Sequence, residues 1–277
     1  MANIKRLCML PRNEFSSYQP YLELNNQYYS YAPDNHNMIR NIVWEVYEVD
    51  DFDFEKTIAL PDVCADIMTF YTEEKAYSFF MGGSISLQQM NELSFMKEVK
   101  SIFGVRLRTG MLGNLFRCDV KDINNSRISM SDALWNGREF EERMEEADNF
   151  IKRWEIMSSY LEQRVAHNYK TNNIVNFVVK EIIDSQGCIT IKELEEKTGY
   201  TGRYLRKVMK DFLGISIKQF CEVTKFQWMC NYYKLRQGDV TLPDLALQSG
   251  YYDQSHMNLC CKKLTGELPK NIINMYS

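Results

Sequence analysis

The sequence has little of what enzymes and metal sites usually need. Histidine occurs only three times among 277 residues, too sparsely for a cluster that binds a metal or transfers protons. The motifs G-x-S-x-G, G-x-x-x-x-G-K-S/T and H-E-x-x-H, which mark hydrolase nucleophiles, phosphate-binding loops and zinc proteases, do not occur. We therefore expect neither an enzyme nor a cofactor.

Long apolar segments are also missing. No uninterrupted apolar run approaches eighteen residues, and the start, MANIKRLCMLPRNEF, lacks the apolar core of a signal peptide. We therefore expect no membrane association and a cytoplasmic protein.

Cysteine is present, but without any spacing that indicates a metal site or a disulfide framework. No C-x-x-C pair occurs among the eight cysteines, which stand at positions 8, 64, 118, 188, 221, 230, 260 and 261. In a reducing compartment, scattered cysteines behave as small buried apolar residues. We expect core positions for them and no disulfide.

Charge is divided unevenly along the chain. The net charge of −4 combines about −7 for residues 1–170 with about +3 for residues 171–277, counted from the sequence. A basic C-terminal part behind an acidic front favours an anionic partner for the C-terminal part only.

The C-terminal part contains an internal repeat. Residues 189–220 align with residues 240–272, with one extra residue in the second copy after a shared Gly-Tyr pair. Each copy predicts a helix after a threonine cap, a turn at Gly-Tyr, and a second helix that ends at a glycine. The marker residues are Thr190, Gly199 and Gly214 in one copy, and Thr241, Gly250 and Gly266 in the other. This is the helix-turn-helix pattern, whose second helix enters the major groove of DNA.

An apolar stripe predicts the buried side of each second helix. The stripes consist of Leu205, Val208, Met209 and Phe212, and of Met257, Cys260, Cys261 and Leu264. His256 and Cys260 have the i, i+4 spacing of two metal ligands on one helix face, but no third ligand lies near them in the sequence. We therefore interpret the cysteine pair as core and expect no metal.

The opposite faces of the two second helices are polar. They present Arg203, Arg206, Lys207 and Lys210 in the first copy, and Ser255, Asn258, Leu259 and Lys262 in the second. Guanidinium groups suit guanine edges and ammonium groups suit phosphates, so the first face favours entry into a DNA groove over a merely solvated surface. The second face is weaker, because Leu259 could contact only a thymine methyl group.

Residues 216–238 predict a helix between the two copies. About twenty residues at the helical rise give a length of roughly 30 Å. That length could place the two second helices about one DNA turn apart, in successive major grooves.

Residues 172–277 resemble the C-terminal DNA-binding domain of AraC/XylS-type transcriptional regulators. The resemblance is carried by GYTGRYLRKVMKDFLGIS and by GYYDQSHMNLCCKKLTGELP. It implies seven helices, double-stranded promoter DNA as a partner, and RNA polymerase as a further one. Carried over by position, the base-reading candidates are Arg203, Arg206 and Lys207, then Gln254, Ser255 and Asn258. The other expected DNA contacts are Lys210, Lys225 and Lys262, with Lys210 and Lys225 as phosphate contacts.

The sequence departs from the family pattern at four positions. Met257 and Cys261 replace phenylalanines, and Leu259 replaces a basic residue. In the linking helix Lys225 is the basic residue nearest the position where relatives carry an arginine. These departures bear on how strongly the second copy contributes to DNA binding.

The first 136 residues predict a β-rich sensor domain. Aromatic and β-branched runs at 41–54, 65–73, 76–85 and 100–110 are typical of strands. The domain resembles the effector-binding or dimerising domains of some relatives. Candidate residues for a pocket that binds a small-molecule effector are Trp44, Tyr47, Phe70, Phe79, Arg106 and Arg108, although most strand aromatics are simple core.

Residues 137–168 predict a long connecting helix. A stripe with alternating spacings of four and three residues indicates a coiled-coil seam for a homodimer, with Phe140, Met144, Ile151, Trp154 and Leu161 among its members. A helix packed on its own β domain would bury the same stripe, and this alternative stays open.

Together these features predict an α+β protein with a β-rich domain at 1–136, a connecting and dimerising helix at 137–168, and a DNA-binding domain at 172–277. The predicted function is sequence-specific transcriptional regulation. The alternative is a ligand-binding or protein-interaction module that binds DNA weakly and without specificity.

Overall fold

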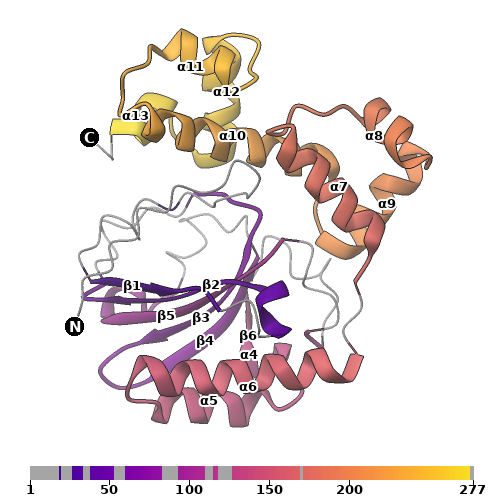
Figure 1. The fold of residues 1–277 in the computed structure, drawn as a ribbon. Coiled ribbons are helices and arrows are strands. Elements are labelled where there is room, and N and C mark those ends of the chain that lie inside the picture. Colours follow the sequence, from indigo (N-terminus) through magenta and orange to yellow (C-terminus); the bar gives the residue numbers. More distant parts are fainter. Residues whose placement is uncertain are drawn as a thin grey trace.

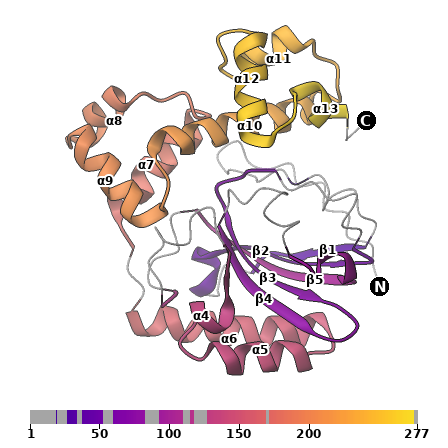
Figure 2. The same ribbon diagram turned by 180° about the vertical axis from the view of Figure 1, so that it is seen from behind.

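The computed structural model describes residue 19 and residues 27–33, 38–52, 60–82, 93–109, 115–117, 127–168 and 171–274. These residues form a β-rich N-terminal domain and an α-helical C-terminal domain, which lie next to each other in both views (Figure 1, Figure 2). The α+β fold class is therefore confirmed. No helix in the described part of the chain combines the length and the apolar character that a membrane span requires.

The N-terminal domain is organised around an antiparallel sheet, six-stranded within the described residues. Its strands are β1 (Tyr28–Tyr31), β2 (Val43–Asp50), β3 (Ala65–Tyr71), β4 (Ala76–Gly82), β5 (Ser101–Leu107) and β6 (Arg127–Ser129), in the spatial order β1-β2-β5-β3-β4-β6. The four predicted strands correspond to β2, β3, β4 and β5. Their predicted ends at 53–54, 83–85 and 110 lie outside the described residues. The short β1 and β6 were not predicted, because they contain too few residues to show an alternating pattern.

Alternation along the strands divides the side chains between the two faces of the sheet. Val46 and Val105 are buried on the face that helices cover. Tyr47 and Phe70 are buried on the opposite face, where the short helix η3 (Met96–Glu98) packs. The domain therefore has an apolar cluster on each side of one sheet.

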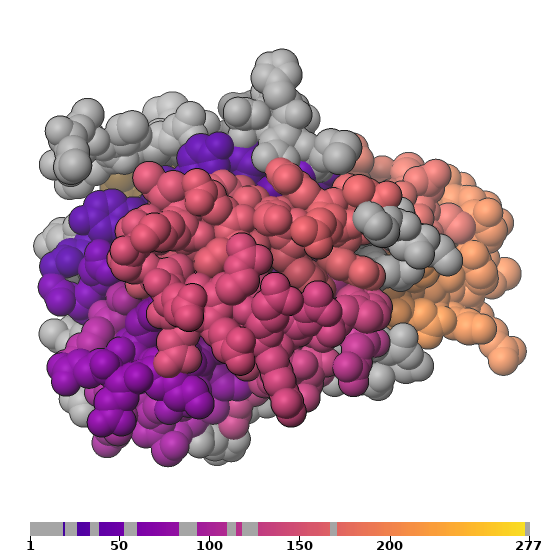
Figure 3. Space-filling model, turned by 90° about the horizontal axis from the view of Figure 1, so that it is seen from below, coloured from indigo at the N-terminus to yellow at the C-terminus, as the bar shows by residue number. Residues whose placement is uncertain are grey.

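Three helices cover the first face. They are α4 (Met130–Ala133), α5 (Gly137–Glu146) and α6 (Phe150–Asn168). Viewed from below, their side chains spread over this side of the N-terminal domain (Figure 3). Figure 2 shows α5 and α6 on the side of the sheet that is turned away from the C-terminal domain.

The prediction of one continuous connecting helix is wrong, because α5 and α6 are separate helices. The chain leaves helical geometry at Ala147, and Asn149 begins the next helix by accepting a hydrogen bond from the backbone N–H of Lys152 at 3.0 Å. An asparagine in this position is a favoured N-cap, so it supports a new helix start better than a helix interior.

The predicted dimer seam is also corrected by the structure. Phe140, Met144 and Leu161 are 5%, 0% and 0% exposed, because they pack into the sheet of their own domain. Trp154 is half-buried against the same cluster, and only Ile151 is well exposed, at 66%. The stripe therefore belongs to the core, as the alternative interpretation held.

Gly104 in β5 lies beneath the ring of Tyr47. A Cβ atom at this position would lie 2.1 Å from Cζ of Tyr47. We expect Gly104→Ala to lower the free energy of unfolding by about 1–3 kcal/mol, as forced overpacking of a core does. Urea unfolding followed by tryptophan fluorescence measures this loss. An unchanged stability would contradict the packing of Tyr47 against this strand.

The C-terminal domain consists of seven helices within residues 171–274. They are α7 (Asn173–Asp184), α8 (Ile191–Thr198), α9 (Gly202–Leu213), α10 (Ile217–Leu235), α11 (Leu242–Gln248), α12 (Gln254–Thr265) and α13 (Pro269–Asn274). The number agrees with the family expectation. The pair α8 and α9 lies near one end of α10, and the pair α11 and α12 lies near the other end (Figure 1).

Local sequence signals fix the ends of these helices. Thr190 and Glu193 form a capping box at the start of α8, and Thr241 caps α11. The turns of the two pairs pass through Gly199 and Gly250, whose φ angles of 72° and 75° are readily adopted only by glycine. The two predicted helix-turn-helix units are therefore present.

Candidate nucleic-acid interface

The first unit, α8 with α9, presents a basic surface. Leu205 and Met209 of α9 are buried in the core of the unit. The predicted contact residues on the other side of the helix are all exposed, and they are Arg203, Arg206, Lys207 and Lys210. The side chain of Thr201 caps the helix by accepting from the backbone N–H of Tyr204 at 3.4 Å. The structure thus brings four cations together on one exposed helix face.

The second unit, α11 with α12, presents a less charged surface. Met257 and Cys261 are buried, whereas Ser255 and Lys262 are exposed on the opposite side of α12. Leu259 is 70% exposed. The predicted base contacts Gln254 and Asn258 are half-buried. The unequal charge of the two faces, which the sequence indicated, is retained in the structure.

Two of the predicted phosphate-contacting lysines also have partners within the domain. Lys210 donates to the carbonyl oxygen of Gly214 at 2.6 Å. Lys225 of α10 donates to the carbonyl oxygen of Gly250 at 3.0 Å and lies 5.6 Å from the ring centroid of Tyr251. Lys225 therefore holds the turn between α11 and α12, and its contact with DNA stays a prediction.

The cysteines and the histidine of α12 have structural roles. Cys261 is fully buried, its Sγ lies 3.8 Å from Sδ of Met229, and burial raises its thiol pKa to about 12. Nδ1 of His256 accepts a hydrogen bond from the backbone N–H of Tyr252 at 3.3 Å. No cluster of three or more metal-ligating side chains occurs in the described residues. The predicted core position is confirmed for Cys64, Cys230 and Cys261, whereas Cys221 and Cys260 are half-buried. The prediction is wrong for Cys188, which is exposed.

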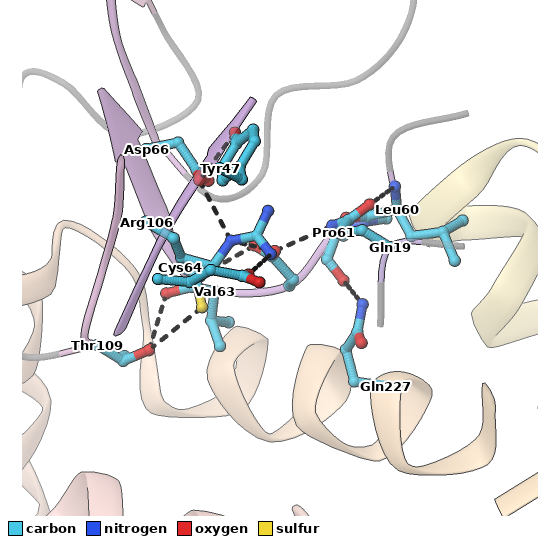
Figure 4. A network of polar contacts seen from close by, with 12 residues as sticks. Gln19, Tyr47, Leu60, Pro61, Val63, Cys64, Asp66, Arg106, Thr109 and Gln227 are labelled. Atoms are coloured by element: carbon cyan, nitrogen blue, oxygen red, sulfur yellow. Dashed lines mark hydrogen bonds and ion pairs between the residues drawn. The ribbon is translucent and has the colours of Figure 1, made fainter. Parts of the chain in front are cut away.

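The front domain contains a buried cluster of charged groups around Arg106 of β5. Its guanidinium Nε lies 3.2 Å from Asp66 and 3.9 Å from Asp62, and Nη1 lies 3.7 Å from Glu45. Tyr47 donates to the same Asp66 oxygen at 3.2 Å (Figure 4). Three carboxylates thus surround one cation on the sheet face opposite α5 and α6.

Burial raises the pKa of Asp66 to about 6, although Arg106 opposes the shift. A carboxyl group whose pKa is higher in the folded than in the unfolded state stabilises the fold at low pH and loses that contribution as the pH rises through 6. Ionised Asp66 therefore costs stability at neutral pH, while its neutral form does not.

We expect the stability gap between Asp66→Asn and the wild type to depend on pH. As the pH rises from 4 to 7.5, the free energy of unfolding of the variant should rise by about 2–3 kcal/mol relative to that of the wild type, because asparagine cannot ionise. Urea unfolding at a series of pH values measures the gap. A gap that is constant over this range would contradict the raised pKa of Asp66.

The predicted pocket residues divide into two groups. Tyr47, Phe70 and Arg106 lie on the same face of the sheet and are almost fully buried, and Phe79 packs against their cluster. Trp44 and Arg108 lie apart from them in a separate pair, with the guanidinium carbon 4.7 Å from the ring centroid. Binding of an effector by any of these residues stays a prediction.

The partners of Arg106 were missed in the sequence. Asp66 lies two residues before Met68 and four before Phe70 in a predicted strand, so its place on the same face of the sheet follows from simple alternation. Glu45 carried the same signal, because it lies two residues before Tyr47 in the predicted strand 41–54, whereas Asp62 lies outside the predicted strands. The buried Gln227 of α10, which binds the N-terminal domain, was also missed.

The fold and the exposed second helices of the two units, α9 and α12, define a two-domain protein with a double helix-turn-helix domain. Comparison with solved structures finds ToxT from Vibrio cholerae. A 1.65 Å structure of ToxT matches with a TM-score of 0.41 and 12% identity over 90% of this chain and 98% of that chain.

Two ligand complexes of ToxT match in a similar way. The complex with (E)-4-(8-methylnaphthalen-1-yl)but-3-enoic acid gives a TM-score of 0.42 at 13% identity, over 91% of this chain and all (100%) of that chain. The complex with an unsaturated fatty acid gives 0.40 at 13% identity, over 91% and 96%. No protein-family profile and no curated protein sequence matches the chain.

Proposed function

We propose that the protein is a sequence-specific, DNA-binding transcriptional regulator of the AraC/XylS type that acts in the cytoplasm. The supporting observation is the presence of two helix-turn-helix units near the two ends of α10, with four exposed cations on the outer face of α9. The 19 residues of α10 span about 28 Å at the helical rise. This length suits two recognition helices in successive major grooves, about one DNA turn apart.

The roles of the individual side chains follow from their chemistry. Arg203 and Arg206 are proposed to read guanine edges through two hydrogen bonds each, Lys207 to contact a base edge, and Lys210 to neutralise a phosphate. On α12, Ser255 and Asn258 are proposed to contact base edges, and Leu259 a thymine methyl group. The second unit therefore contributes fewer positive charges than the first, and its apolar contact suits thymine, whereas the arginines of the first unit suit guanine.

The weak charge of α12 favours one alternative function. Leu259 stands at the centre of its exposed face, and an apolar residue there would equally suit a module that binds a ligand or another protein. Such a module would bind DNA through the cations of α9 alone, weakly and without sequence preference.

Binding to genomic fragments at several salt concentrations separates the two functions. A regulator should give discrete complexes with a few fragments, and its specific affinity should fall steeply with salt, as release of counterions requires. The alternative module should bind all fragments equally. Discrete complexes in electrophoretic mobility shifts support the regulator, and uniform smearing contradicts it.

The N-terminal domain is proposed to sense a small-molecule effector or to form a homodimer. The buried position of Arg106 among three carboxylates argues against a carboxylate ligand for this guanidinium, because its charge is already compensated. Contact of the regulator with RNA polymerase is part of the same proposal.

Among the named seam residues only Ile151 of α6 is well exposed, so a homodimer is proposed to form around this residue and not through the buried stripe. We expect Ile151→Glu to convert a dimer into a monomer in sedimentation velocity without unfolding it, because Ile151 is 66% exposed in a single chain. Exposed Lys152, the next residue, supplies the control Lys152→Ala, which should leave the dimer intact. A wild type that sediments as a monomer at micromolar concentration would contradict the proposal.

A further inference from the structure

A loop of the N-terminal domain is inserted against the DNA-binding domain. This loop, residues 60–64, precedes β3 and is called the strap below. All its residues are buried except Val63, which is half-buried. Figure 4 shows the strap between Arg106 of the sheet and Gln227 of α10. The strap therefore contacts both the N-terminal sheet and the DNA-binding domain.

The first residue of the strap belongs to the core of the second helix-turn-helix unit. Leu60 is 4% exposed and lies in one apolar cluster with Phe226 of α10, Leu245 of α11 and Met257 of α12. A residue of the N-terminal domain thus helps to complete the core from which α12 projects.

The middle of the strap is bound to the centre of α10. Gln227 is 0% exposed, and its side-chain Nε2 donates to the carbonyl oxygen of Pro61 at 2.8 Å. This hydrogen bond attaches the strap to the helix that joins the two units. Because both groups are buried, loss of this bond would cost more than loss of a bond between solvent-exposed groups.

The strap also contacts the first unit. Val63 packs against the apolar cluster of the first unit, which includes Leu205 and Met209 of the recognition helix α9. Its φ angle is 58°, a left-handed conformation that is strongly disfavoured for a β-branched residue. Such a conformation persists only where surrounding contacts hold it.

The base of the strap is fixed to the N-terminal domain. Asp62 accepts from the backbone N–H of Cys64 at 3.0 Å and lies 3.9 Å from Nε of Arg106. The carbonyl oxygen of Val63 accepts from the hydroxyl of Thr109 at 3.3 Å. The charged cluster on the sheet is therefore connected, through five residues, with the apolar clusters to which both recognition helices contribute.

We propose that the strap positions the two recognition helices relative to each other, so that the N-terminal domain sets the spacing of the DNA sites that the protein reads. Leu60 and Val63 are the positioning residues, one for each unit. This inference rests on the proposed function, because it requires two readers on one DNA duplex. The units are also joined by α10, and the strap adds contacts with both cores.

The experiment measures the dependence of affinity on spacing with the full-length protein. A duplex selected from a random library by the wild type is compared with versions that carry one or two extra base pairs between the two contacted segments. Two base pairs rotate one segment by about 70° relative to the other, since a turn contains about 10 base pairs. We expect the wild type to lose affinity about tenfold or more on the longer duplex.

The strap variant should tolerate the altered spacing. For Leu60→Ala we expect a difference of about threefold or less between the original and the longer duplex. The matched control is Leu245→Ala, which truncates a buried leucine of the same cluster on α11. It should lower stability in the same manner but keep the full spacing penalty, because it leaves the strap intact.

A second variant keeps the inference testable if Leu60→Ala does not fold. Val63→Gly removes the packing on the first unit but relieves the left-handed backbone, so it should fold and should also relax the spacing requirement. Specific binding with an unchanged spacing penalty in both variants overturns the positioning role and leaves the regulator intact. Failure to select any duplex overturns the proposed function and the inference with it.

Discussion

Replacing Arg106 with methionine is expected to lower the free energy of unfolding by about 3–5 kcal/mol at pH 7.5. Arg106 is 5% exposed and is the cation that faces Asp66, Asp62 and Glu45 in the buried cluster. Methionine keeps much of the length and the apolar contacts of arginine but leaves the three carboxylates uncompensated. Urea unfolding measures the loss.

The pH dependence identifies the cause of this loss. Protonation of Asp66 reduces the repulsion among the carboxylates, so the effect of Arg106→Met should be smaller at pH 5 than at pH 7.5, and the added change Asp66→Asn should restore part of the stability. The control is Lys100→Met, which breaks an exposed ion pair with Glu73 and should cost about 0–1 kcal/mol. Equal losses for both variants would contradict the role of the buried cluster.

The second large effect is expected on DNA binding. Arg206→Ala should weaken binding to a specific site by about 1–3 kcal/mol and relax the preference at one base position, because a guanidinium that binds two acceptors of guanine is lost. Arg206 is exposed on α9, so the variant should fold normally. Competition binding with a set of single-base variants of the site measures both changes.

Lys210→Ala provides the comparison on the same helix. Loss of a phosphate contact should weaken binding to all DNA sequences alike. It should also reduce the slope of log affinity against log salt concentration by about one. The change also removes the hydrogen bond to the Gly214 carbonyl at the end of α9, so thermal unfolding should be recorded alongside. An Arg206→Ala variant that keeps full affinity and full base preference would contradict the assignment of α9 as a reader.

The C-terminal domain was predictable because its signals are local. Caps, glycine turns and apolar stripes lie within a few residues of the elements they define, and Thr190, Gly250 and Gly266 all act where the repeat placed them. The two exposed faces follow from helical periodicity alone. Contacts of these faces with DNA are decided by a partner molecule, and periodicity carries no information about it.

The packing of α5 and α6 and the contacts of the strap were not predictable from local signals. The seam of 137–165 follows a heptad spacing, but an apolar stripe does not reveal whether it faces a second chain or its own sheet. In the structure, Asn149 caps the start of a separate helix, and Met144 packs into the core of the chain's own N-terminal domain. The strap rests on a hydrogen bond between residues 166 positions apart, and no local pattern encodes such a contact.

Hydroxyl-radical footprinting of the full-length protein on a selected duplex tests the central claim most directly. Two recognition helices near the ends of α10 predict two protected segments on one face of the DNA, with centres about 10 base pairs apart. Arg206→Ala should weaken protection of one segment more than the other. A single protected segment of about half a turn, or uniform protection along the duplex, would contradict the reading of two successive major grooves.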